Sequence, residues 1–351
     1  MNLNENLEYA LIGIALFSIV LLTLFLYLFT QRLRQNRFEQ RIQTYIQTHM
    51  DDWYNYLITE SETAILNESR IISTTDKEAI DRIFTRYVKN IKNEDIRDKI
   101  AHYNQLNSRK FYLKKLQSKN WGERISILYK INEFKMSFLV PEVEKILRRA
   151  KKLTLEEYVI CLKILAVYNR NLFLAHLYKP KMRLGEFEYK KLIHELDKSY
   201  FQEFKERFDQ LPLNLRISFI EILGYEADSS ISSITFLECL LDHYDSEFRI
   251  RAMKALAHIS AYINFERYKQ FANSNIWEER LMFAKLLLHI PENLARPYLE
   301  KLIEDEVWFV RKQAATTLSK IKNGMSSLEQ IIQSSSDQYA VDAAKESLKK
   351  E

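Results

Sequence analysis

A short pattern recurs along this chain about every thirty residues, and each copy marks the start of a predicted helix. An aromatic or aliphatic residue precedes an arginine by three positions, and small or aliphatic residues follow at helical spacing. The copies are Trp121 with Arg124, Leu213 with Arg216, Phe248 with Arg251, Trp277 with Arg280, and Trp308 with Arg311. From Arg216 onward these arginines lie 35, 29 and 31 residues apart. Periods of this size predict a solenoid of stacked helix pairs.

Helices are expected in pairs throughout this region, and the fold class is all-α. The chain has only 5 Gly and 5 Pro, too few for the turns of sandwiches, barrels or dinucleotide-binding units. Thr154 and Glu157 form a predicted capping box at one helix start. The predicted pairs are 111–119 with 121–134, 143–151 with 155–168, 172–178 with 187–196, 200–208 with 213–223, 234–241 with 248–260, 265–272 with 277–290, 298–303 with 308–321, and 327–332 with 339–348.

An uncharged run of 22 residues, 9–30, predicts a single transmembrane helix. At about 1.5 Å per residue it spans roughly 30 Å, the thickness of a bilayer core. A cleaved signal peptide is the alternative, but the first eight residues carry acids and no bases, and no small-residue cleavage site follows. A basic flank follows the run at Arg32, Arg34, Arg37 and Arg41. The positive-inside rule then predicts a cell-membrane protein with residues 1–8 outside and the rest in the cytoplasm.

Residues 31–106 are expected to form a helical juxtamembrane region before a solenoid over 107–351. Apolar residues such as Ile42, Trp53 and Leu57 form a stripe at three-and-four spacing along 31–58. Such a stripe must be buried. It either packs on the helices that follow or forms a coiled-coil homodimer through residues 31–58.

The second helices of the predicted pairs resemble those of the HEAT-repeat family. The resemblance rests on the turn acids Asp242, Asp245 and Asp305 and on Arg251, Arg280 and Arg311, and it covers about 107–351. It implies that the repeated tryptophans and arginines are structural. Each arginine should bond to an acid or a carbonyl in an adjacent turn, with Asp305 a candidate partner of Arg311. The tryptophans Trp121, Trp277 and Trp308 are expected in the core, and the second helices on the concave face.

The sequence contains no motif for catalysis or for binding a cofactor or metal. Five scattered glycines cannot form a phosphate-binding loop or a nucleophile elbow. His194 and Glu195 begin like a zinc-binding motif, but Lys198 stands where the second histidine is required. No catalytic, cofactor-binding or metal-binding residue is therefore predicted, and the chain is not expected to be an enzyme.

Two sets of basic residues are candidates for contact with other molecules. Residues 31–152 carry 25 Lys and Arg against 16 Asp and Glu, whereas residues 153–351 carry 27 against 29. Basic residues close to the predicted anchor favour contact with anionic lipid; these are Arg32, Arg34, Arg37, Arg109, Lys110, Lys114 and Lys115. Polar positions on the second helices form the candidate surface for a partner: Arg249, Lys254, Lys285, Lys312 and Lys320.

These features favour a membrane-anchored scaffold or adaptor that holds a protein partner at the inner membrane face. An envelope or polysaccharide enzyme complex is one candidate partner, and the composition indicates a bacterial source. Two alternatives remain open. Some proteins with this kind of fold are DNA glycosylases, so an enzyme of that type is one. A lipid- or nucleic-acid-binding module that uses the basic residues of 99–152 is the other. The anchor and the near-neutral C-terminal half disfavour nucleic acid.

Overall fold

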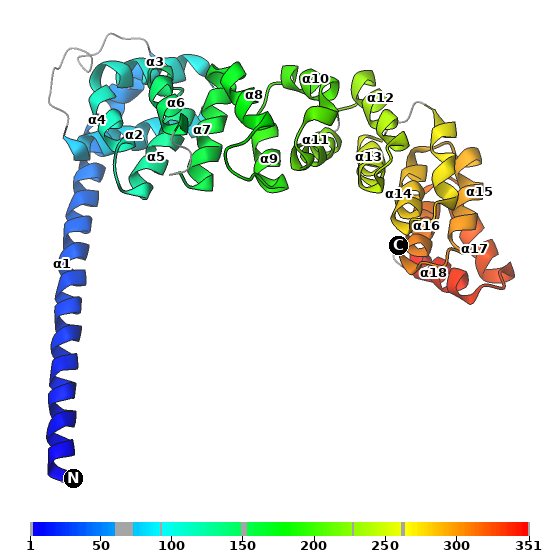
Figure 1. Cartoon of the computed structure of the whole chain (residues 1–351), viewed down its shortest axis with the longest axis horizontal. Helices are drawn as coiled ribbons and strands as arrows, with labels where there is room; N and C mark the ends of the chain where they lie inside the picture. The colour runs from blue at the N-terminus through cyan, green and yellow to red at the C-terminus, as the bar shows by residue number, and fades with distance from the viewer. Residues whose placement is uncertain are drawn as a thin grey trace. The chain divides into compact units, whose positions relative to one another are not determined.

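The computed structural model describes residues 3–59, 73–91, 93–148, 153–226, 228–260 and 264–349. All regular secondary structure in these ranges is helical (Figure 1), so the all-α prediction is confirmed. The chain divides into two compact units, Met1–Tyr168 and Asn169–Glu351. This division falls inside the range predicted as a solenoid, and the two units are described in turn.

The first unit begins with one long helix, α1 (Leu3–Ile58), of 56 residues. Its apolar part is long enough to cross a membrane, with a mean hydropathy of 2.7 over a window in which no residue is buried. The predicted span 9–30 lies wholly within α1. No proline interrupts the helix, so the polypeptide passes without a turn from the apolar part into the part that packs on other helices.

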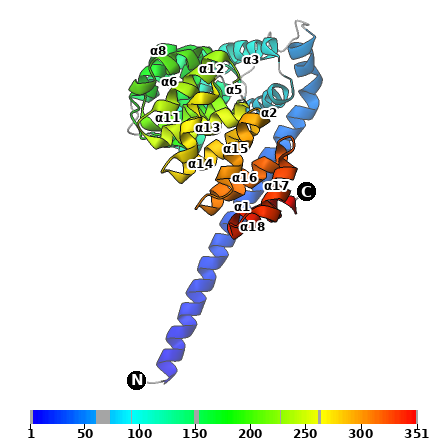
Figure 2. The same cartoon turned by 90° about the vertical axis from the view of Figure 1, so that its right-hand side faces the viewer.

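The C-terminal part of α1 packs on α2 (Thr74–Asn90) and α3 (Glu94–Asn107) (Figure 1 and Figure 2). Ile42, Trp53 and Leu57 are buried there, and the Trp53 ring lies edge-on to Phe84 at 5.1 Å between centroids. The centre of the apolar stripe is therefore covered within the chain. This is the packing alternative of the two, and a homodimer through the exposed residues of 31–58 stays a prediction.

Two helix pairs complete the first unit. They are α4 (Arg109–Leu116) with α5 (Trp121–Glu133), and α6 (Val140–Arg148), which follows the 3-10 helix η2 (Ser137–Leu139), with α7 (Leu155–Tyr168). The predicted capping box opens α7: the Glu157 carboxylate accepts from Thr154 N at 2.9 Å, and Thr154 Oγ1 accepts from Glu157 N at 3.2 Å. Local sequence thus determines where this helix starts.

The second unit is a row of helix pairs. The described pairs are α8 (Arg170–Tyr178) with α9 (Glu186–Ile193), α10 (Ser199–Glu206) and η4 (Phe208–Gln210) with α11 (Leu213–Tyr225), α12 (Ile231–Cys239) and η5 (Leu240–Asp242) with α13 (Ser246–Ile259), η6 (Phe265–Arg267) and η7 (Lys269–Asn273) with α14 (Trp277–Leu286) and η8 (Leu287–His289), α15 (Glu292–Leu302) with α16 (Trp308–Lys320), and α17 (Gly324–Ser334) with α18 (Gln338–Leu348).

The second helices of these pairs pack directly against one another, in the order α9, α11, α13, α14, α16 and α18. At one contact α11 presents Gly224 to Ala255 of α13. A Cβ on Gly224 would lie 2.7 Å from the Ala255 Cα atom, so a larger residue there would force the two helices apart. The second helices therefore form one continuously packed layer of this unit, and their place on the concave face stays a prediction.

Candidate binding groove

An arginine at the fourth position of a second helix ties that helix to the loop before it. In each case the Nη1 atom donates to a carbonyl six residues earlier in the chain. The bonds join Arg124 to Ser118 at 3.0 Å, Arg249 to His243 at 2.6 Å, Arg280 to Ser274 at 2.7 Å, and Arg311 to Asp305 at 2.7 Å. We call these four residues the arginine ladder.

Three ladder arginines also reach an acid in the next repeat. Arg124 Nε donates to Glu157 at 2.8 Å, and Arg249 Nε donates to Glu279 at 2.7 Å. Both acids occupy the third position of the following second helix. In the repeat after Arg280 that position is the apolar Val310, and Arg280 instead makes two bonds to Asp305, at 2.6 and 2.9 Å. These charge-assisted bonds link successive repeats.

The structure corrects the predicted register in one repeat. Arg249 belongs to the ladder, whereas Arg251, which was assigned to it, lies two positions further along α13. The error came from aligning Phe248 with the tryptophans, although the first residue of α13 is Ser246. Arg249, Arg280 and Arg311 are spaced by 31 residues at each step, a regularity that could have identified the ladder. Because its guanidinium is bound, Arg249 is also removed from the candidate partner surface.

Arg216 occupies the ladder position of α11 without an acid to bond. The residue at the acid position of the next helix is Phe248, and the guanidinium lies 4.8 Å from the centre of its ring. Asp209 is 3.9 Å away and exposed. A cation–π contact thus replaces the charge-assisted bond at this step.

The tryptophans do not lie in the core, which corrects that expectation. Trp121 and Trp308 are each 46% exposed, and Trp277 is half-buried with its ring stacked on Phe309 at 5.6 Å. Each is the first residue of its helix. Trp121 Nε1 donates to Thr154 Oγ1 at 3.0 Å, so this ring spans neighbouring loops instead of the space between helix layers.

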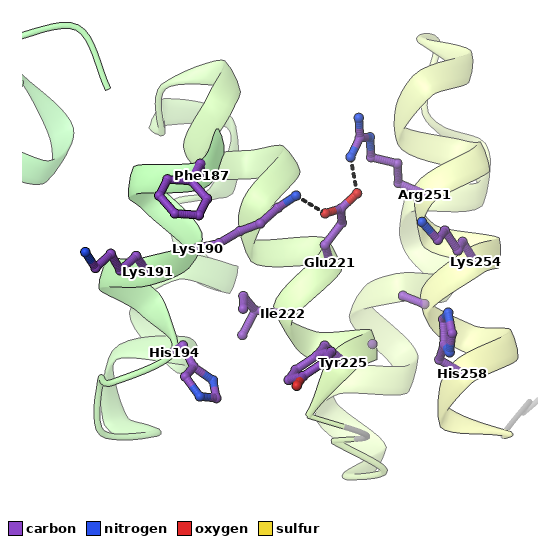
Figure 3. Close-up of a pocket in the computed structure, with 12 residues that line it drawn as sticks. Phe187, Lys190, Lys191, His194, Glu221, Ile222, Tyr225, Arg251, Lys254 and His258 are labelled. Carbon is purple, nitrogen blue, oxygen red and sulfur yellow. Dashed lines mark hydrogen bonds and ion pairs between the residues drawn. The ribbon is translucent and has the colours of Figure 1, made fainter. Parts of the chain in front are cut away.

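A groove of about 780 Å³ crosses the second helices α9, α11 and α13 (Figure 3). Ile222, Gly224 and Ala255 form its floor. Phe187 and Tyr225 stand at its sides, and their side chains are 72% and 78% exposed. Large aromatic residues this exposed are suited to contact with another molecule. No sequence motif marked this site, because its residues come from three helices of three different repeats.

One carboxylate in the groove holds two cations. Lys190 and Arg251 approach the Glu221 carboxylate from opposite sides, as the dashed lines in Figure 3 show. Burial alone raises the pKa of Glu221, but the hydrogen bond from Lys190 and the charge of Arg251 outweigh it and hold that pKa below its ordinary value. Arg251 also pairs with Glu186 and Glu247. Its charge is therefore satisfied within the chain.

Other cations at the groove are exposed and make no ion pair among the described residues. These are Lys191 of α9 and Lys254 of α13. His258, one turn after Lys254, has its pKa lowered by partial burial and by the charges of Lys285 and Lys254. The groove thus combines an apolar floor, exposed rings and two lysines that make no ion pair in the described chain.

The other predicted surface residues lie elsewhere. Lys285 is on α14, Lys320 is exposed at the end of α16, and Lys312 lies 4.5 Å from the Trp308 ring centre and 3.4 Å from a Glu346 oxygen. The lipid candidates belong to the first unit: Arg32, Arg34 and Arg37 are exposed on α1, Arg109, Lys110 and Lys114 are exposed on α4, and Lys115 pairs with Glu123. Their contact with lipid stays a prediction.

A buried polar cluster in the first unit was also missed from the sequence. Lys77 is 2% exposed, and its Nζ atom donates to Asp81 at 2.6 Å and to Asn104 at 2.9 Å. Asp81 accepts further bonds from Tyr112 at 2.6 Å and Lys130 at 2.8 Å. The cluster joins α2, α3, α4 and α5. Among the residues the structure describes, no group of His, Cys, Asp or Glu side chains could hold a metal ion.

Comparison with known proteins finds a match to a family model in one C-terminal range of the chain. No curated protein matches the sequence. A crystal structure of an engineered protein aligns over 81% of this chain and 86% of its own, with 15% identity and a TM-score of 0.35. Residues 266–349 match the family model for HEAT repeats, and this range contains the ladder residues Arg280 and Arg311. The range 266–349 is therefore similar to HEAT repeats.

Proposed function

We propose that this protein is a membrane-anchored scaffold that binds a protein partner through the second-helix face of Asn169–Glu351. The groove over α9, α11 and α13 is the observation that carries the proposal. It offers exposed aromatic side chains beside cations that have no partner in the groove, and such a surface is recognised by a complementary one. The second helices pack mainly on those of neighbouring repeats, which leaves one continuous face for a partner.

The proposal of a membrane anchor is supported by helix α1. Its apolar part is exposed along its whole described length, which is unfavourable in water and favourable in lipid. Arg82 makes two hydrogen bonds to Glu39, at 2.7 and 2.9 Å, and so attaches α2 to α1 about nine residues beyond the predicted span, roughly 14 Å along the helix. This continuous helix would hold the first unit at a defined height above the bilayer.

Site-specific photo-crosslinking in native membranes tests the binding face. A photoreactive amino acid replaces Tyr225 in the groove or, as the control, Gln202, an exposed residue of the first helix α10. We expect a discrete protein adduct from position 225 and none from position 202. Adducts of equal yield from both positions, or from 202 alone, would show that the partner binds another face.

Cysteine labelling tests the orientation. A cysteine at Asn4 should react with an impermeant thiol reagent in intact cells, whereas one at Ser335 should react only after lysis. The opposite pattern would reverse the topology. Removal of residues 1–30 should release the protein from the membrane fraction. A truncated protein that stays with the membrane without aggregating would reveal a second membrane contact, for which α4 is the first candidate.

A further inference from the structure

We infer that the groove over α9, α11 and α13 binds a short acidic peptide segment that inserts one bulky apolar side chain between Phe187 and Tyr225. This inference rests on the proposed function and names the chemistry of the partner. The floor of the groove leaves room for a ligand. At Gly224 and Ala255 the helices present almost no side chain, so a ligand can approach closely at the centre of the groove.

The size of the groove fits such a segment. A volume of about 780 Å³ is within the usual range of ligand sites, roughly 300–1,000 Å³, and exceeds what one side chain fills. The two exposed rings flank Ile222 (Figure 3). An aromatic or aliphatic side chain placed there would remove both ring faces from water, and burial of large aromatic surfaces dominates the energy of most interfaces.

The charge of the groove requires an acidic ligand. Its single lining carboxylate, Glu221, is already held by Lys190 and Arg251. Lys191 and Lys254 stand on opposite sides of the groove without an ion pair in the described chain. Carboxylates on both sides of the inserted residue would pair with these two lysines. Such pairs add specificity and speed of association.

The charges around the groove favour a peptide over nucleic acid. The second unit carries 26 Lys and Arg against 27 Asp and Glu, so it has no general positive field. Glu186 and Glu247 contact Arg251, and Glu226 lies 3.4 Å from His194. These acids at the groove edge would repel a continuous phosphate backbone, which binds best to an extended basic track. A peptide with separate carboxylates can avoid them.

The test measures fluorescence anisotropy with the full-length protein in detergent. The probe is a labelled peptide in which one tryptophan is flanked on each side by three glutamates. We expect saturable binding that weakens as salt is added. The same peptide with glycine in place of tryptophan, or with lysines in place of glutamates, should bind at least tenfold more weakly. Oligo-dT and phosphatidylglycerol vesicles are the competitors that represent nucleic acid and lipid.

Two variants locate the site. Lys191→Glu with Lys254→Glu should weaken peptide binding at least tenfold, and Tyr225→Ala should weaken it at least fivefold. The matched control is Lys179→Glu with Lys198→Glu, which makes the same change in charge at exposed residues outside the groove and should leave binding unchanged. All variants should melt within a few degrees of the parent protein, because the substituted side chains are exposed.

The possible outcomes separate this inference from the proposed function. Equal loss of binding in the control and groove variants, no binding by the folded parent, or stronger displacement by oligo-dT or vesicles than by unlabelled peptide would each overturn the acidic-peptide assignment. The proposed function would then still stand if position 225 crosslinks a protein in native membranes. If position 225 gives no adduct while the peptide binds, the groove recognises acidic peptides but the proposed partner does not use it.

Discussion

One pair of lysines in each unit of this molecule shows two opposite uses of the same side chain. In Met1–Tyr168, Lys77 is buried and Lys130 is largely covered, and both end on the single carboxylate of Asp81. In Asn169–Glu351, Lys191 and Lys254 are exposed at the edge of a groove and meet no carboxylate there. Buried charges need partners inside the chain, whereas exposed ones remain free for a ligand. The lysines around Asp81 thus join helices within the fold, whereas Lys191 and Lys254 belong to the proposed binding surface.

The reason lies in how the helices meet. In the first unit, the Asp81 carboxylate bonds to residues of three helices, α2, α4 and α5. In the second unit the second helices pack mainly on those of neighbouring repeats, and ladder arginines link successive repeats at the helix starts.

The largest loss of stability is expected from a substitution in the buried polar cluster around Asp81. Asp81→Ala would leave Lys77 buried without its partner, and it should lower the free energy of unfolding by about 3–5 kcal/mol. Chemical denaturation of the full-length protein in detergent measures this. Asp98→Ala, at an exposed acid of α3, is the control and should change stability by less than about 0.5 kcal/mol. A similar small change for Asp81→Ala would mean that the cluster adds no stability.

The ladder should give the next largest effect. Arg280 and Asp305 have side chains that are only 9% and 7% exposed, so Arg280→Ala would leave a buried carboxylate and should cost about 3 kcal/mol. Arg251→Ala, at a more exposed pair, should cost less than about 1 kcal/mol. The two arginines held the same place in the predicted repeat. Equal losses in thermal melts would therefore support the predicted register against the observed one.

Glu221 should show a smaller effect that depends on pH. Its pKa is lower in the folded protein than the ordinary 4.5, so the ionised form adds stability above about pH 4.5 that is lost as the pH falls through the folded pKa. Glu221→Gln should cost less than about 1 kcal/mol at pH 7, because the site is partly exposed. The difference from the parent should shrink as the pH falls below about 4.5. A constant difference across this range would show that Glu221 acts through packing and not through charge.

The smallest effect is expected at His258. Its pKa is lowered by burial and by Lys285 and Lys254, while Glu221 of α11 also lines the groove. A bound acidic peptide would favour the protonated ring, so peptide affinity should rise by less than about threefold between pH 7.5 and pH 5.5. His258→Gln should remove this rise. An unchanged pH profile in the variant would assign the rise to another group.

Prediction from sequence succeeded where the signal was local. The helix pairs follow from apolar spacing, and the cap at Thr154 and Glu157 forms as expected. Prediction was less successful where it had to decide which residue of one repeat contacts the next repeat. Phe248 and the tryptophans look alike in sequence, yet Phe248 is buried and Trp121 is half-exposed. A shift of two positions was enough to exchange the roles of Arg249 and Arg251.

The amino-acid sequence by itself determined an all-α chain with one long apolar helix followed by helix pairs. Hydrophobic period, caps and breakers act over a few residues and so can be recognised in one dimension. Only the tertiary structure decided that Lys77 is buried on Asp81 and that Phe187, Tyr225 and Lys254 share one groove. These residues are brought together by the packing of separate helices, and the close approach that Gly224 permits is a property of two helices in contact.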